Sequence, residues 1–189
     1  MAYTPKILAF AGSTRKESFN KKLVKIAADG ARSAGAQVTY LDLRDTPMPF
    51  YDGDLEAEQG LPDNAKKFKD MMLAHDGLLI SAPEYNSSIT GVLKNTIDWA
   101  SRPPGENPFG GKVVSLMSAS PGALGGLRGL VVVRALLSHL GTIVLPAQVA
   151  VPKAHEAFGP DGKLKDPKQQ AGIEALGRDL VEILTKIKG

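Results

Sequence analysis

The feature that most constrains this sequence is the alternation of short apolar runs with segments of helical periodicity. Lys6 to Ala11 is a compact apolar run, Leu23, Ile26, Ala27 and Ala31 then recur at helical spacing, and residues 37–43 again alternate as in a strand. The pattern continues with expected helices at 63–75, 91–100 and 126–140 and expected strands at 77–82, 112–117 and 142–145, with an apolar stretch at 149–151. Asp166 and Pro167 open a last helix as cap and first residue. This order predicts an α/β fold in which helices cover both faces of a five-stranded parallel sheet.

Length and composition limit the organisation further. A chain of 189 residues suits one full domain, so we expect residues 1–189 to form a single domain. The absence of cysteine excludes disulfides, thiolate nucleophiles and cysteine-ligated metals, so redox chemistry would need a bound cofactor. The net charge of +3 is scattered and favours no nucleic-acid partner. No apolar stretch nears the roughly 20 residues that span a bilayer, and the start lacks a signal-peptide pattern, so we expect a cytoplasmic protein with no membrane partner.

The loop after the first strand has the composition of a phosphate site. In parallel sheets ligands bind beyond the carboxyl ends of the strands. Here Ser13, Thr14 and Ser18 offer hydroxyl donors, Arg15 offers a guanidinium, and a helix amino terminus follows. The loop matches neither the nucleotide-triphosphate motif nor the Gly-x-Gly-x-x-Gly motif. A hydroxyl-rich turn with a helix cap is the alternative interpretation.

Two further loops have groups that suit a planar, polar-edged ligand. Pro83 stiffens the loop after the third strand, Tyr85 can lie against a flat ring, and Asn86 can bind polar ring edges. The glycines in the segment 118–126 would let a ring approach the backbone. The alternatives are an ordinary exposed tyrosine, a turn asparagine and a flexible connector.

Other reaction classes find little support in the sequence. No Gly-x-Ser-x-Gly segment precedes a helix, and no histidine is placed for a catalytic triad, so hydrolysis is a poor interpretation. The histidines show no metal-ligand spacing, and no metal site is predicted. Trp99 is expected in the core or at a subunit contact.

The three loops together resemble the NADPH-dependent FMN reductase family, whose members include quinone, chromate and azo-dye reductases. The matching segments are GSTRKESFN at 12–20, PEYNSSITGVLKNTIDWASRP at 83–103 and SASPGALGG at 118–126, with a further match at 42–54. The resemblance implies a flavodoxin-like three-layer sandwich with strand order 2-1-3-4-5 and non-covalently bound FMN. It implies that Ser13, Arg15, Ser18 and Asn20 hold the FMN phosphate, that Pro83, Glu84, Tyr85 and Asn86 border the isoalloxazine, and that Ser118, Ser120 and Gly122 complete the pocket.

The same resemblance implies an activity. Hydride would pass from NADPH or NADH through FMN to an acceptor such as a quinone, an azo compound, free flavin or a metal oxyanion. The cofactor performs such chemistry, which agrees with the lack of an evident catalytic acid or base. Family members form dimers or tetramers, so we expect a homodimer or homotetramer with contacts from the helices at 91–101 and 126–140. The alternatives are a flavodoxin-like electron carrier and a non-enzymatic flavin-binding protein.

Overall fold

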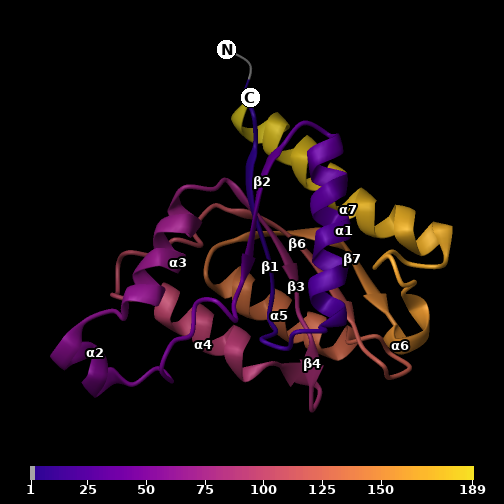
Figure 1. Ribbon diagram of the computed structural model, residues 1–189. Coiled ribbons are helices and arrows are strands. Elements are labelled where there is room, and N and C mark those ends of the chain that lie inside the picture. Colours follow the sequence, from indigo (N-terminus) through magenta and orange to yellow (C-terminus); the bar gives the residue numbers. More distant parts are fainter. Residues whose placement is uncertain (1–2) are drawn as a thin grey trace.

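Five parallel strands form the centre of the computed structural model, which describes residues 3–189 (Figure 1). The sheet order is β2-β1-β3-β6-β7, and the bounds are β1 (Lys6–Ala11), β2 (Gln37–Asp42), β3 (Gly77–Ser81), β6 (Val113–Ala119) and β7 (Ile143–Val151). Counting only these sheet strands, the order is the expected 2-1-3-4-5. Every neighbouring pair in the sheet is parallel. The predicted fold class is therefore confirmed.

Each face of the sheet has its own helical layer. Alternate strand side chains point to opposite faces: Ile7 and Ala9 belong to one core, and Leu8 and Phe10 to the other. The first core lies beneath α1 (Phe19–Ser33) and α7 (Pro167–Lys188). The second lies beneath α3 (Asp63–Leu73), α4 (Gly91–Ala100) and α5 (Leu127–His139). Burial on both faces explains why the three central strands β1, β3 and β6 read as largely apolar runs.

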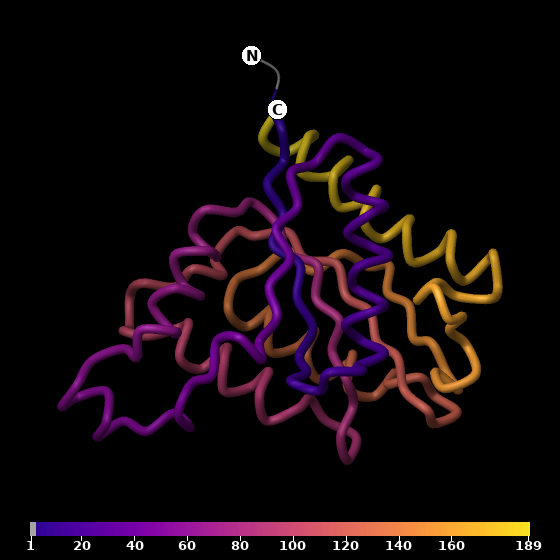
Figure 2. Tube along the Cα trace, viewed as in Figure 1, coloured from indigo at the N-terminus to yellow at the C-terminus, as the bar shows by residue number. Residues whose placement is uncertain are grey.

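The segment between β2 and α3 differs from the sequence prediction. The sequence pattern predicts no helix or strand there, but the segment contains α2 (Gly53–Gln59), on a part of the chain that projects from the body of the molecule (Figure 2). None of the α2 residues is buried, so the helix has no apolar periodicity to reveal it. Its ends are nevertheless marked, because the Asp52 side chain accepts a hydrogen bond from Asp54 N and Gly60 follows with positive φ.

The last strand is longer than expected. Residues 142–145 and 149–151 were separate apolar stretches in the sequence, whereas β7 runs through Pro146 without interruption. The pairing with β6 shifts register between Val114 and Leu116, as at a β-bulge. The Arg134 side chain on α5 donates to the carbonyls of Val144 and Leu145, which satisfies backbone acceptors at this irregular point.

Three short elements were not predicted. β4 (Glu84–Tyr85) and β5 (Ser88–Ile89) form a separate antiparallel hairpin, and α6 (Ala154–Ala157) follows β7. They are too short to show a sequence period. Within residues 3–189, no helix is both long and apolar enough to cross a membrane.

Candidate functional site

The three predicted loops meet at one edge of the sheet. They follow β1, β3 and β6, which are neighbours in the sheet, and Figure 2 shows their turns at the same edge of the molecule. Backbone bonds join the starts of these loops: Gly12 N donates to Ser81 O, and Ala82 N donates to Met117 O. All eleven predicted site residues belong to these three segments or to the first turn of α1.

The loop after β1 leaves the start of α1 without a side-chain cap. Ser18 is the N-cap residue, yet its side chain makes no cap hydrogen bond, and the first turn contains no acidic residue. Ser13 and Ser18 are buried, while Arg15 is exposed beside them. The Ser13 hydroxyl accepts from Arg15 N at 3.3 Å, which holds the loop in a tight turn. An anion at this helix start would meet free amides, hydroxyl donors and a guanidinium.

From the first turn of α1, Asn20 joins the ends of β3 and β6 through hydrogen bonds of its side chain. Its side-chain oxygen accepts from Ser81 Oγ at 2.8 Å and from Ala119 N at 3.0 Å. Its side-chain nitrogen donates to Ala119 O at 2.8 Å. All three residues are buried, so water does not replace these bonds. The Asn20 side chain is thus committed largely to protein partners, and its contact with a phosphate stays a prediction.

A second buried link was missed in the sequence. Thr90 is the N-cap of α4, and its hydroxyl accepts from Leu93 N at 3.2 Å and donates to Gly12 O at 2.7 Å. A threonine before a helix is a recognisable capping signal, but its bond to a residue 78 positions earlier leaves no trace in the sequence. The link fixes the first loop against the start of α4.

The two remaining loops supply an exposed hairpin tip and a glycine-rich turn. Pro83 is buried, and Tyr85 at the tip has 54% of its surface exposed. Glu84 lies between them with its carboxylate turned to α5, where it accepts from Gly129 N at 2.9 Å.

In the glycine-rich turn, the Ser120 hydroxyl accepts from Gly122 N at 3.2 Å. Ser118 at the end of β6 is fully buried, and its hydroxyl has no hydrogen-bond partner within the described part of the chain.

Outside the three loops, a hydrogen bond joins the segment before α2 to α4. Trp99 is fully buried and donates from Nε1 to Pro49 O at 2.8 Å, so its predicted place in the core is confirmed.

Glu56 accepts from Tyr51 Oη at 2.9 Å and from Arg102 Nε at 2.8 Å. Desolvation acts to raise the pKa of Glu56, but the hydrogen bonds from Arg102 and Tyr51 outweigh it and lower this pKa. The hydrogen bond to Glu56 raises the pKa of Tyr51.

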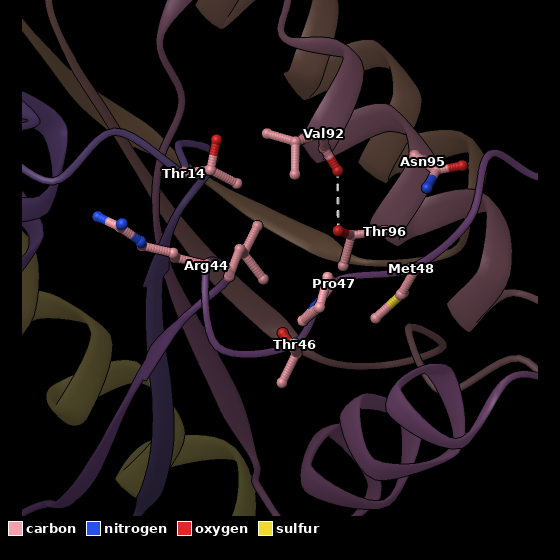
Figure 3. Close-up of a pocket in the computed structure, with 9 residues that line it drawn as sticks. Thr14, Arg44, Thr46, Pro47, Met48, Val92, Asn95 and Thr96 are labelled. Atoms are coloured by element: carbon pink, nitrogen blue, oxygen red, sulfur yellow. Dashed lines mark hydrogen bonds between the residues drawn. The ribbon is translucent and has the colours of Figure 1, made fainter.

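A cavity of about 220 Å³ borders the first loop (Figure 3). It lies between the segment after β2 and α4, and none of the eleven predicted residues lines it. The hydroxyl of Thr46 is buried there without a partner in the part of the chain that is described, whereas Thr96 Oγ1 donates to Val92 O. The cavity touches the predicted phosphate loop only through Thr14. It is therefore a neighbour of the loop and not the predicted ring pocket.

The arrangement fits FMN. The uncapped start of α1 with Ser13, Ser18 and Arg15 matches a phosphate dianion, and the hairpin tip and glycine-rich turn lie on the adjacent strands. In residues 3–189 no group of histidines and acidic residues could hold a metal ion. Fold and site together define an α/β protein of the flavodoxin type with an uncapped helix start at the carboxyl edge of its sheet.

Comparison with known proteins agrees with this class. Residues 5–156 match the NADPH-dependent FMN reductase family. An NAD(P)H-dependent FMN reductase of Pseudomonas aeruginosa is 37% identical over 170 residues, which are 89% of each chain. A quinone reductase of Pseudomonas putida is 36% identical over 88% of each chain.

Solved structures extend the similarity to the fold. FerB, a flavoenzyme NAD(P)H:(acceptor) oxidoreductase of Paracoccus denitrificans, aligns with a TM-score of 0.84 and 30% identity over 97% of this chain and 98% of that one. An archaeal flavodoxin aligns with a TM-score of 0.63 at 12% identity over 95% of this chain and 98% of that one, which supports the fold alone.

The chain belongs to the NADPH-dependent FMN reductase family. It is an FMN-dependent oxidoreductase with NAD(P)H as co-substrate.

Proposed function

We propose that this protein transfers hydride from NADPH or NADH to a quinone, with FMN held at the carboxyl edge of β1, β3 and β6. The observation that carries the proposal is the uncapped start of α1, which lies at the same edge of the sheet as the loops after β3 and β6. Relatives named quinone reductase, at 36% identity in Pseudomonas putida, and NAD(P)H:quinone oxidoreductase, at 34% identity in Solanum tuberosum, support the choice of acceptor.

The first loop is assigned to the FMN phosphate. Ser13 and Ser18 would donate from their hydroxyls, Arg15 would pair with phosphate oxygens, and the free amides of α1 would complete the cradle. Asn20 would support this cradle mainly by fixing the strand ends around it, because its amide already bonds Ser81 and Ala119. Phosphate binding would therefore depend on both direct donors and a rigid frame.

The isoalloxazine is assigned to the other two loops. Pro83, Glu84, Tyr85 and Asn86 would border it through backbone and tyrosine ring, and Ser118, Ser120 and Gly122 would complete the pocket. FMN supplies the hydride chemistry when bound, so the chain needs no catalytic acid or base. The protein's own contribution would be to bind, orient and partly shield the ring, with the exposed Tyr85 at the open side where a nicotinamide or a quinone could enter.

Several finer properties belong to the same proposal. Azo compounds, free flavin and metal oxyanions such as chromate would be alternative acceptors, because one open site can admit different planar or small oxidants. We also propose that residues 1–189 act as one cytoplasmic domain that assembles into a homodimer or homotetramer. The exposed side chains of Leu127 and Val131 on α5, 43% and 61% accessible, would contribute to the subunit contact.

Anaerobic addition of NADPH to FMN-loaded protein tests the activity. We expect the flavin absorbance to bleach with one equivalent of NADPH or NADH and to return when a benzoquinone is added. An electron carrier would not turn over with nicotinamide, and a mere binding protein would not bleach. Failure with both nicotinamides would overturn the proposed function in favour of one of these alternatives.

A further inference from the structure

The β4–β5 hairpin has a tight turn that its own sequence does not favour. The turn residues Asn86 and Ser87 have φ values of 52° and 62°, and neither is glycine. A two-residue hairpin turn of this kind requires left-handed backbone at both positions. Asparagine tolerates that conformation, but serine adopts it at a cost. Contacts outside the turn must therefore hold the hairpin in place.

Glu84 provides such a contact at the base of the hairpin. One carboxylate oxygen accepts from Gly129 N at 2.9 Å, and the other lies 3.5 Å from Arg128 Nε, with 13% of the side chain exposed. The receiving helix, α5, has no cap of its own: its N-cap Gly126 is left-handed without a side chain, and its first turn has no acidic residue. Glu84 thus supplies from another element the acceptor and the negative charge that a helix start favours.

The start of α5 is shaped for this contact. A Cβ at Gly129 would lie 3.1 Å from Glu84 Cβ, and a Cβ at Gly126 would lie 2.0 Å from Ser118 Oγ. The distance at Gly126 is too short for any side chain, and the distance at Gly129 is tighter than most Cβ contacts. The first turn of α5 therefore packs at once against the hairpin after β3 and against the end of β6. It joins the two segments assigned to the ring of FMN.

We propose that Glu84 is a positioning residue whose carboxylate binds the start of α5 and thereby fixes the Tyr85–Ser87 tip relative to the Ser118–Gly122 segment. This inference rests on the proposed function, because it deepens the role of the same site. The Glu84 carboxylate faces α5, so its effect on the ring is indirect. Loss of the Glu84 carboxylate should disturb the placement of the ring. The phosphate cradle follows β1, which lies on the other side of β3 from β6, and it should stay unchanged.

The test compares Glu84→Ala with wild type in the full chain loaded with FMN. The measurements are kcat and KM for NADPH with a benzoquinone, the visible circular dichroism of the bound flavin, and competition of inorganic phosphate against FMN. Loss of a hydrogen bond to a charged group predicts a fall in kcat of about tenfold or more in Glu84→Ala, with altered dichroism. Phosphate competition should stay within about twofold of wild type, because the α1 cradle keeps its donors.

Two variants show whether the effect belongs to this contact. Glu84→Gln keeps an acceptor for Gly129 N and should recover most of the lost kcat. Glu156→Ala removes an exposed acid in α6 and should behave as wild type. If Glu84→Ala fails to fold, Glu84→Asp takes its place, because its shorter side chain cannot reach Gly129 N from the same backbone position and should lower kcat as well.

The outcomes separate this inference from the proposed function. Wild-type kcat and dichroism in Glu84→Ala, or in Glu84→Asp where it is needed, overturn the positioning role while the proposed function stands. An equal loss of phosphate and FMN binding also overturns it, since the damage would then be general. Wild-type protein that binds FMN but reacts with neither NADPH nor NADH overturns the proposed function, and the positioning role with it.

Discussion

Replacement of Asn20 by alanine should reveal how far the site depends on the buried link from α1 to the ends of β3 and β6. The side chain makes three hydrogen bonds of 2.8 to 3.0 Å, and it is 4% exposed. Its partners are the hydroxyl of Ser81 and both backbone groups of Ala119. The truncated side chain would leave these three groups buried and unpaired.

The size of the effect follows from the number of groups left unpaired. Each buried polar group without a partner costs about 1–3 kcal/mol, and partial entry of water reduces the sum. We expect a loss of about 3–4 kcal/mol in the free energy of unfolding. For a chain of this length that corresponds to a fall in Tm of roughly 10 °C.

Urea unfolding of the FMN-free protein measures this loss without interference from the ligand. Asn107 gives a matched control, because its exposed side chain donates to Leu140 O and accepts from Phe109 N. Asn107→Ala should cost less than about 1 kcal/mol, since water replaces its bonds. A similar small loss in Asn20→Ala would refute the reasoning that the strand ends depend on this residue.

Three further predictions concern charge, packing and pH. Arg15→Ala should weaken FMN binding by about 1.5–3 kcal/mol in a fluorescence titration, because a charge-assisted contact is lost. Lys67→Ala on α3 should leave FMN affinity unchanged. Equal FMN affinity of Arg15→Ala and wild type would show that Arg15 does not contact the phosphate. In α7, Gly177→Ala should lower the free energy of unfolding by about 1–3 kcal/mol, because its Cβ would lie 2.0 Å from Ala27 O. Gly172→Ala in the same helix has open space around its Cβ and should be neutral or stabilising. Urea unfolding that ranks the two variants in the reverse order would contradict this packing. The folded-state pKa of Glu56 is lowered, so its contribution to stability is present above the ordinary glutamate pKa and is lost as the pH falls. Urea unfolding should therefore show Glu56→Gln less stable than wild type near neutral pH and the two converging in acid, and a constant difference would contradict this.

The sequence predicts those elements that have strong local signals. β1 and α4 have the expected bounds, because one is a continuous apolar run and the other begins at Gly91, directly after a capping threonine. α2 shows no such signal, since it buries none of its residues. β7 was predicted as two separate apolar stretches, and no local pattern reveals that Arg134 from α5 bonds the carbonyl of Leu145 between them.

The candidate site also has features with a local sequence signal and features that only the folded chain shows. Hydroxyl groups, a guanidinium and a helix start close together in the sequence indicate the phosphate cradle without any tertiary information. The bonds of Asn20 join it to residues 61 and 99 positions away, so only the folded chain shows that its amide is already engaged. The direction of the Glu84 carboxylate likewise depends on α5, which comes later in the chain. Binding of FMN by the eleven residues stays a prediction.

Titration of the FMN-free protein with FMN and with riboflavin shows whether the start of α1 binds the FMN phosphate. If the cradle at the start of α1 holds the phosphate, one FMN should bind per chain, and riboflavin, which lacks the phosphate, should bind at least about tenfold more weakly. The preference for FMN should largely disappear in Arg15→Ala. Equal affinity of the wild-type protein for both flavins would contradict the phosphate site, and absence of binding to either would contradict the account as a whole.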